Sequence, residues 1–306
     1  MVYKFHYELR GNREQPRILF CHGFMGSSQE FDEAISLLCE EFCCLGVDLP
    51  GHGKTKVFGG DECYTMPNTA HALKNLLEQL NFEPCFLVGY SMGGRLALYM
   101  TLHFPQCFSK VVLESASPGL KTEAEQLKRR QRDWQIAEKL ETGDLLTFLS
   151  NWYNQPLFSS LKQHPNFEQM IKIRQQNNPL ALAKSLRHMS TGCQPSLWES
   201  LQHNQVPLLL LVGDYDHKFK SINSEIVTLC PEAHLNVIAD CGHNIHFENV
   251  NEFVKNVRQF LYTKGNREQG TGNREQGTGN REQGVAMQRG LGEPVRSWGF
   301  PPETKP

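Results

Sequence analysis

Ser91 stands in a short motif whose residue types and neighbours suit a reactive hydroxyl group. The motif is Gly89-Tyr90-Ser91-Met92-Gly93; the apolar run Cys85–Val88 precedes it, and a helical pattern ended by Pro105 follows it. Small residues around a serine allow a sharp strand-to-helix turn that exposes the hydroxyl, and a helix N-terminus favours developing negative charge. The motif therefore predicts that Ser91 is catalytic.

A serine of this kind works with a carboxylate and a histidine that follow it in the chain, in that order. His243 comes after the apolar run Leu235–Ala239, and the preceding Gly242 gives it the loop start that this position needs. His246 is a nearby rival for the same role. We expect His243 to be the base, and His52 and His217 to be loop or surface residues.

Two aspartates could supply the acid. Asp214 and Asp216 both follow the apolar run Pro207–Val212, within Gly213-Asp214-Tyr215-Asp216. Their spacing from that run does not separate them, so both remain candidates at this point.

The oxyanion hole of such a site needs two backbone amides. One comes from the residue after the nucleophile and the other from a loop that follows an earlier strand. His22-Gly23-Phe24 follows the apolar run Arg17–Cys21, so we expect Phe24 and Met92 to be the donors. We interpret His22 itself as a structural residue of a tight turn.

The elements that must position these residues alternate along the chain. Short β-prone runs are separated by apolar residues at helical spacing, which predicts a mostly parallel sheet flanked by helices. The predicted strands are Tyr3–Leu9, Arg17–Cys21, Phe42–Val47, Cys85–Val88, Lys110–Leu113, Pro207–Val212 and Leu235–Ala239. The segment 117–200 breaks the alternation with a helical pattern, so we expect it to be a cap over a discontinuous core of residues 1–116 and 201–264.

The C-terminal residues 265–306 begin with a seven-residue repeat, Gly265–Thr271, that lacks apolar positions. A repeated seven-nucleotide unit would encode the same series, and we expect this tail to be disordered. The same five residues occur as Gly11–Gln15, which we expect to be an insertion in a hairpin loop.

The overall composition limits the classes of function. An apolar fraction of 39%, a charged fraction of 21% and a net charge of −2 give no indication of a nucleic-acid or membrane partner. The ten cysteines include no Cys-x-x-Cys pair and suit buried thiols. Without a signal-peptide pattern or a transmembrane stretch, we expect a cytoplasmic protein with no metal, no cofactor and no obligate protein partner.

Together these motifs resemble the α/β-hydrolase superfamily. Asp48–Gly53 matches a loop of that superfamily in which the acid is usually structural. The resemblance implies the α/β-hydrolase fold with an inserted helical cap. It also favours Asp216 over Asp214, because the acid of the superfamily usually stands three residues after the glycine.

Four segments make the resemblance more specific. They resemble the 2-succinyl-6-hydroxy-2,4-cyclohexadiene-1-carboxylate synthase (MenH) family, from about Ile18 to Leu261 and including the cap. The segments are Gly89–Ala97, Glu114–Leu120, Asn151–Phe158 and Gly213–Phe219. Asp214 is a departure, since glutamate is more usual there.

The resemblance implies a pocket in which arginines bind a tricarboxylate substrate, because their planar groups suit carboxylates. Arg95 lies one helical turn beyond Ser91 and could face the pocket, or it could pair with Glu114. Arg129 and Arg174 match two further anion-binding positions, although Arg129 could equally lie on a solvated helix face. Tyr90 and Trp152 match pocket residues and could alternatively belong to the core.

The activity implied is the elimination of pyruvate from 2-succinyl-5-enolpyruvyl-6-hydroxy-3-cyclohexene-1-carboxylate in menaquinone or phylloquinone biosynthesis. Two alternatives remain open. One is hydrolysis of an ester, thioester or carbon–carbon bond by the same serine; the other is a catalytically silent binding module of the same fold.

Overall fold

The computed structural model describes residues 2–263; the predicted disordered tail, 265–306, lies outside them. The strands are β1 (Tyr3–Lys4), β2 (Tyr7–Arg10), β3 (Arg17–Cys21), β4 (Cys43–Val47), β5 (Lys56–Val57), β6 (Cys85–Tyr90), β7 (Phe108–Glu114), β8 (Leu208–Gly213) and β9 (Ala233–Ile238). The helices are α1 (Asp32–Leu38), α2 (Met66–Gln79), α3 (Met92–His103), α4 (Glu123–Thr142), α5 (Leu145–Tyr153), α6 (Phe167–Arg174), α7 (Pro179–His188), α8 (His217–Leu229), α9 (Ile245–Glu248) and α10 (Val250–Tyr262).

Seven strands form one sheet in the order β2-β4-β3-β6-β7-β8-β9. β2 runs antiparallel to β4, and every other neighbouring pair is parallel. The prediction of a mostly parallel sheet is confirmed. Because parallel strands end at the same edge, the loops after β3, β6, β8 and β9 meet there.

The N-terminal hairpin prediction is wrong. Tyr3–Leu9 is not one strand but two, and β2 pairs with β4 instead of β3. The loop that holds Gly11–Gln15 therefore passes the start of β4 before β3 begins. It closes on itself through the bond from the Gln15 amide to the Asn12 carbonyl, 3.0 Å, and the Gln15 side chain donates to the Glu40 carbonyl. Alternating apolar residues could not distinguish a hairpin from this crossing.

Helices cover both faces of the sheet. Side chains of β3 alternate between the faces: Leu19 and Cys21 join the core beneath α2 and α3, whereas Ile18 and Phe20 join the core beneath α1 and α10. This alternation explains why the central strands read as continuous apolar runs, since both of their faces are buried. None of the helices within residues 2–263 is long and apolar enough to cross a membrane.

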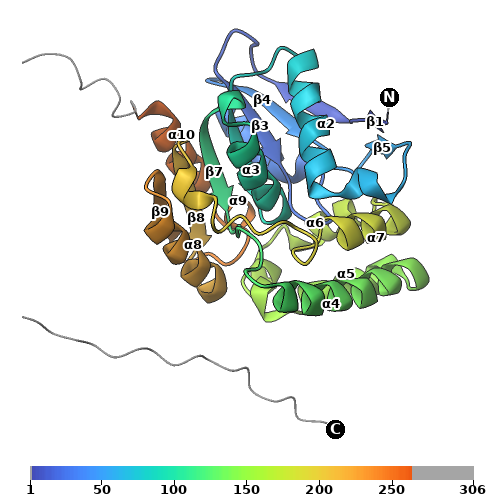
Figure 1. Cartoon of the computed structure of the whole chain (residues 1–306). Coiled ribbons are helices and arrows are strands. Elements are labelled where there is room, and N and C mark those ends of the chain that lie inside the picture. Colours follow the sequence, from blue (N-terminus) through green and yellow to red (C-terminus); the bar gives the residue numbers. More distant parts are fainter. Residues whose placement is uncertain (1, 264–306) are drawn as a thin grey trace, which may run out of the picture. The chain divides into compact units, whose positions relative to one another are not determined.

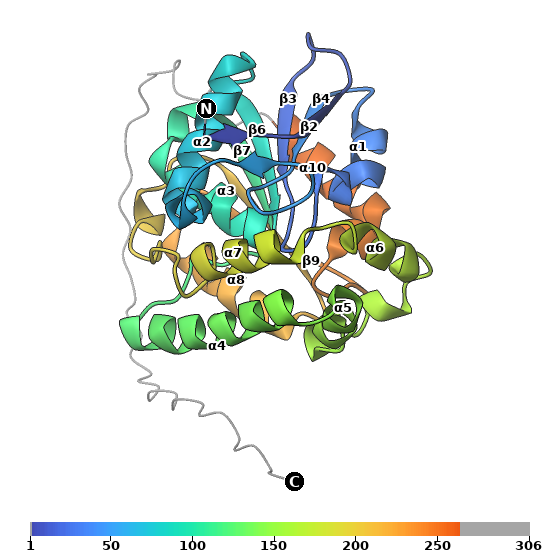
Figure 2. The same cartoon turned by 90° about the vertical axis from the view of Figure 1, so that its right-hand side faces the viewer.

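The segment between β7 and β8 contains α4, α5, α6 and α7, which lie together on one side of the sheet (Figures 1 and 2). These helices have an apolar cluster of their own, which includes Leu140, Leu149, Met170 and Leu182. Met25, from the loop after β3, is buried in that cluster. The segment predicted to be a cap is thus packed directly against the loop that carries Phe24.

Two glycines of the Ser91 motif are required by close packing. A Cβ atom on Gly93 would lie 2.1 Å from the carbonyl oxygen of Cys21, and one on Gly89 would lie 2.5 Å from that of Gly93. The first turn of α3 therefore touches the end of β3 directly. Ser91 joins the strand to the helix with φ 50° and ψ −105°, a conformation that a non-glycine residue rarely adopts.

Replacing Gly93 by alanine tests this constraint. The added methyl group meets backbone on β3 that cannot move aside, so Gly93→Ala should lower the free energy of unfolding by about 3 kcal/mol or prevent folding. Urea denaturation followed by circular dichroism measures the change. Gly60→Ala is the control, because its Cβ would meet only the flexible end of Glu62; equal stabilities of the two variants would contradict the analysis.

Candidate active site

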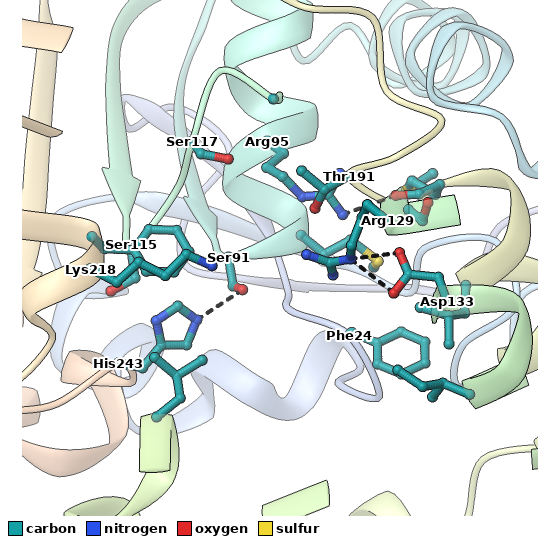
Figure 3. A pocket seen from close by; sticks show the side chains of 18 of the residues that line it. Phe24, Ser91, Arg95, Ser115, Ser117, Arg129, Asp133, Thr191, Lys218 and His243 are labelled. Carbon is teal, nitrogen blue, oxygen red and sulfur yellow. Dashed lines mark hydrogen bonds and ion pairs between the residues drawn. The ribbon is translucent and has the colours of Figure 1, made fainter. Parts of the chain in front are cut away.

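Ser91, His243 and Asp216 form a chain of hydrogen bonds. The Ser91 Oγ lies 3.0 Å from His243 Nε2, and His243 Nδ1 lies 2.6 Å from Asp216 Oδ2 (the serine–histidine bond is drawn in Figure 3). An ionised carboxylate only accepts hydrogen bonds, so Nδ1 carries the proton and Nε2 accepts from the serine hydroxyl. This tautomer prepares the histidine to withdraw a proton from Ser91.

The acid and base loops hold each other in place. Asp216 begins α8, where its Oδ1 accepts from the Phe219 amide at 3.1 Å, leaving Oδ2 for His243. The amide of Tyr215 donates to the Cys241 carbonyl at 2.9 Å, which ties the loop after β8 to the loop after β9. Asp216 and His243 are both buried, at 4% and 3% exposure, so water does not compete for their contact.

The two rival residues have other partners. Asp214 is exposed and forms an ion pair with Lys220. His246 is buried, and its Nδ1 lies 2.7 Å from Glu114 Oε2. Neither contacts Ser91, so the geometry separates Asp216 from Asp214, which spacing did not.

The loop after β3 is fixed by His22. Its Nδ1 lies 2.7 Å from the Gly23 carbonyl oxygen, which also accepts from the Gly26 amide, while its Nε2 accepts from the Leu49 amide at 2.9 Å. Burial lowers the pKa of His22, which suits a neutral ring that donates at one nitrogen and accepts at the other. Because the Gly23 carbonyl and the Phe24 N–H belong to one trans peptide, fixing the first aims the second the opposite way.

The second amide expected in the oxyanion hole belongs to Met92, the first residue of α3. The first amides of a helix have no intrahelical acceptor, and the helix dipole makes their surroundings favourable to an anion. Phe24 and Met92 both line the cavity that contains Ser91.

His52 is a loop residue that the structure buries. His52 lies in a loop, as expected, but it is only 1% exposed, with its ring centroid 5.0 Å from that of His22. Burial and the neighbouring His22 hold its pKa well below the usual range. The glycine-rich sequence around it gave no sign that α7 would cover this loop.

The cavity above Ser91 has a volume of about 240 Å³ and lies between the sheet edge and the cap (Figure 3). Its charged lining consists of several cations and one carboxylate, and its apolar lining includes Trp152 and Phe158. The charged residues are Arg95, Arg129, Arg132, Lys218 and Asp133. Within residues 2–263 no group of three or more histidines, cysteines or carboxylates is placed to hold a metal ion.

Arg95 faces this cavity and does not pair with Glu114. Its Nη1 donates to Gln194 Oε1 at 2.8 Å and its Nη2 to the Met189 carbonyl at 2.9 Å. Both acceptors are neutral, and among residues 2–263 no carboxylate lies within ion-pair distance of the Arg95 guanidinium. Burial and the nearby Arg129 lower the pKa of Arg95 to about 9, which means that an anion entering the cavity would relieve an unfavourable charge.

The other residues expected in the pocket differ in their placement. Arg129 lines the cavity, and its Nε lies 2.9 and 2.8 Å from the two oxygens of Asp133. Trp152 also lines it, with its ring centroid 5.5 Å from that of Phe24. Tyr90 does not; its buried ring packs against His243, at 5.5 Å between centroids.

Arg174 does not line the cavity, contrary to the expectation that it binds substrate. It is buried against Glu30, with which its Nη2 pairs, and its Nη1 donates to the Phe24 carbonyl at 3.5 Å. The other oxygen of Glu30 accepts from the Gly23 amide at 3.2 Å. Burial alone would raise the pKa of Glu30, but the charges of Arg174 and His246 hold it below its usual value. The Glu30–Arg174 pair thus holds two adjacent residues of the loop after β3, Gly23 and Phe24.

Sequence reasoning did not identify Lys218, Arg132, Asp133 or Glu30. Lys218 stands two residues after Asp216, and this proximity was the available signal. Arg132 and Asp133 lie near Arg129 in a region rich in charge, where no spacing separates the cavity side from the solvent side. No motif near Glu30 predicted that it would pair with Arg174, which lies 144 positions further along the chain.

The fold and this site are those of the α/β-hydrolase class of proteins. A family model described as the alpha/beta hydrolase fold matches residues 16–250. The chain is 34% identical over 255 residues to the 2-succinyl-6-hydroxy-2,4-cyclohexadiene-1-carboxylate synthase of Citrobacter koseri, covering 82% of this chain and 96% of that protein. It is 32% identical over 257 residues to the enzyme of that name from Serratia proteamaculans, covering 84% and 97%.

A solved structure is similar to this chain in the same way as these relatives. The structure of MenH from S. aureus superposes with a TM-score of 0.79 at 35% identity, covering 85% of this chain and 97% of that one. The chain therefore belongs to the 2-succinyl-6-hydroxy-2,4-cyclohexadiene-1-carboxylate synthase family of the α/β-hydrolase fold.

The Glu30–Arg174 pair can be tested without assuming a substrate. If the pair positions Phe24, then Glu30→Gln, Arg174→Gln and the double variant should each slow the labelling of Ser91 by an uncharged fluorophosphonate by about tenfold. The losses should not add, because both residues act through one loop. Mass spectrometry follows the labelling, and circular dichroism checks that each variant is folded.

Arg187→Gln is the matched control. Arg187 pairs with Glu141 within the cap, away from the oxyanion loop, so its labelling rate should match that of the unmodified protein. A residue that only binds substrate carboxylates would not affect an uncharged reagent. Wild-type labelling of the Arg174→Gln variant would therefore rule out a positioning role.

Proposed function

We propose that this protein eliminates pyruvate from 2-succinyl-5-enolpyruvyl-6-hydroxy-3-cyclohexene-1-carboxylate and forms 2-succinyl-6-hydroxy-2,4-cyclohexadiene-1-carboxylate. The observation that carries the proposal is a single cavity in which the Ser91–His243 hydrogen bond faces a cluster of cations. The family relatives named above carry the name of this synthase. The reaction would serve menaquinone or phylloquinone biosynthesis.

The chemistry starts with a ring proton next to the succinyl ketone. Ser91 gives its proton to His243 and takes the ring proton, so that the imidazolium formed is stabilised by Asp216. The freed electron pair forms one ring double bond, the existing double bond shifts, and the carbon–oxygen bond to the enolpyruvyl group breaks. The enolpyruvate leaves, takes up a proton and becomes pyruvate. No water is consumed.

The role proposed for the oxyanion loop is to stabilise charge on the ketone oxygen. When the neighbouring proton leaves, negative charge is shared with that oxygen, and the amides of Phe24 and Met92 are fixed donors for it. Their fixed orientation matters, because donors that need no rearrangement stabilise the transition state more than the ground state.

The carboxylates of the substrate would be held by Arg95 and Arg129. Arg95 is bound only by neutral acceptors, so a carboxylate is the partner that its charge lacks. Trp152 would pack against the ring, whereas Tyr90 would support His243 from beneath. Holding the ring in this way would keep its acidic carbon within reach of the Ser91 hydroxyl.

Ordinary hydrolysis fits the site less well. A neutral ester would leave the guanidinium of Arg95 with neutral hydrogen-bond acceptors only, at a cost in binding. A catalytically silent module would have no need for the hydrogen bonds that join Ser91, His243 and Asp216. The proposal includes a cytoplasmic location, which suits the burial of most of the ten cysteines as thiols.

The triad assignment is tested with the enolpyruvyl substrate. Purified protein should release pyruvate, which lactate dehydrogenase detects. Ser91→Ala and His243→Ala should each lower kcat about a thousandfold or more, with the fold intact. Asp216→Asn should have a similarly large effect, whereas the matched change Asp214→Asn should stay within about twofold, because Asp214 is exposed and paired with Lys220. The opposite ranking of the two aspartates would refute the assignment.

The role of Ser91 as a base has a separate test. Deuterium at the ring position next to the ketone should slow the chemical step, and rapid-quench mass spectrometry should find no adduct on Ser91 during turnover. An adduct formed and consumed as fast as pyruvate appears would instead make Ser91 a nucleophile.

A further inference from the structure

Glu114 is a buried carboxylate to which the proposed reaction gives no role. It is the last residue of β7 and is 0% exposed. Its Oε1 accepts from the amides of Ile245 at 2.6 Å and His246 at 3.1 Å, and its Oε2 lies 2.7 Å from His246 Nδ1. An ionised carboxylate only accepts hydrogen bonds, so Nδ1 of His246 carries the proton. Three donors thus hold this carboxylate, all of them just after His243 in the chain.

The backbone of Glu114 holds the serine turn at the same time. The Ser91 amide donates to the Glu114 carbonyl at 2.9 Å. The carbonyl therefore ties down the turn between β6 and α3, while the carboxylate of the same residue ties down the start of α9. The 3.0 Å contact between Ser91 Oγ and His243 Nε2 joins these two turns. One residue thus fixes the segments on both sides of the contact on which the chemistry depends.

The ring of His246 extends this support to the loop that carries Phe24. Within residues 2–263 its Nε2 has no hydrogen-bond partner, and it lies 3.9 Å from Glu30 Oε1. The other oxygen of Glu30 accepts from the Gly23 amide. His246 therefore stands between two buried carboxylates, one that holds the serine turn and one that holds the loop after β3.

Tyr90 lies against each of these parts. Its ring centroid is 4.9 Å from that of His246 and 5.5 Å from that of His243. A Cβ atom on Gly23 would lie 2.6 Å from the same ring. Burial and the charges of Glu30 and Glu114 raise the pKa of Tyr90 well above its usual value. The position of His246 thus bears on the residue that precedes Ser91 as well as on the base.

We propose that Glu114 and His246 form a second carboxylate–histidine pair, which sets the positions of Ser91, His243 and the loop of Phe24 relative to one another. Neither residue of the pair lines the cavity above Ser91, so both are positioning residues that act through their neighbours. The effect on pyruvate release rests on the proposed function, whereas the effect on the Ser91 hydroxyl does not.

The effect is expected on kcat and not on KM. Proton transfer at Ser91 depends on close alignment of its hydroxyl, the imidazole and the amides, whereas the cavity wall contains neither member of the pair. His246→Phe keeps a ring of similar size but removes the side-chain donor from Glu114, which has no water to replace it. This variant should lower kcat for pyruvate release about thirtyfold and leave KM within about twofold.

Two amide variants separate the nitrogens of the His246 ring. Asparagine can place a donor near the position of Nδ1 and so keep the bond to Glu114, whereas the longer glutamine places its amide near Nε2. If the bond to Glu114 positions the site, kcat of His246→Asn should exceed that of His246→Gln by about tenfold. Equal values for the two variants would show that only the volume of the ring matters and would overturn the inference.

The carboxylate is tested in the same assay. Glu114→Ala should lower kcat at least as much as His246→Phe, and the double variant should lose no more than Glu114→Ala alone, because the two residues act as one pair. Losses that multiply in the double variant would contradict a shared role. The comparison of asparagine with glutamine at position 246 does not depend on whether Glu114→Ala folds.

His6 provides the matched control. Its Nδ1 lies 2.9 Å from Asp48 Oδ2, and the Asp48 carboxylate also accepts from the amides of Ser28 at 2.6 Å and Lys54 at 2.7 Å. This pair has the same kinds of bond, but His6 does not line the cavity above Ser91. His6→Asn and His6→Gln should keep kcat within about twofold of each other and of the wild type, even where thermal denaturation shows a lower Tm. A tenfold difference between them would mean that such a loss acts through stability alone, against the inference.

Labelling of Ser91 by an uncharged fluorophosphonate gives a readout that needs no turnover. The rate constant for labelling should be about tenfold higher for His246→Asn than for His246→Gln, as for kcat, with both variants folded by circular dichroism. If the wild-type protein released no pyruvate, the proposed function would fail, yet the labelling rates would still decide whether the pair positions Ser91. Equal labelling rates would reject the inference while leaving the elimination intact.

Discussion

The contact between the first turn of α3 and the end of β3 is the constraint on which the site depends. At Gly93 the helix lies so close to the Cys21 carbonyl that no side chain fits between them. This contact places the loop of Phe24 beside the turn of Ser91, so that Phe24 and Met92 line the same cavity as the serine. It also leaves Ser91 at φ 50°. The strain is held by packing on both sides, and the serine hydroxyl needs no further rearrangement to meet His243.

Above this edge of the sheet, the cap and the core are joined by hydrogen bonds and an ion pair as well as by apolar packing. Arg95 of the core binds Gln194 and the Met189 carbonyl, which follow the cap helix α7. Arg174 of the cap binds Glu30 and the Phe24 carbonyl. The first contact fixes a wall of the cavity above Ser91, and the second fixes the loop that carries Phe24. The cap is thereby connected to both halves of the proposed chemistry.

Much of this arrangement could be predicted because the relevant signals are local. Ser91, Asp216 and His243 each stand just after an apolar run, and parallel strands deliver such positions to one edge of a sheet. Long-range partners carry no such signal. Glu30 and Arg174 gave no mutual pattern, and the seven strands did not reveal that β2 would pair with β4. Charge on α4 was visible, but which arginine faced the cavity depended on the way that the cap packs.

The crossing between β2 and β3 has a consequence for how this gene can change. The loop with Gly11–Gln15 precedes β3, whereas the loop with Phe24 follows it. The two therefore lie at opposite edges of the sheet. Extra residues before β3 lengthen a connection without altering the distance between Ser91 and anything it touches. Extra residues after β3 would alter that distance at once. We therefore expect a short duplication in the coding sequence to leave the Ser91 contacts unchanged when it falls before β3 and to disturb them when it falls after β3.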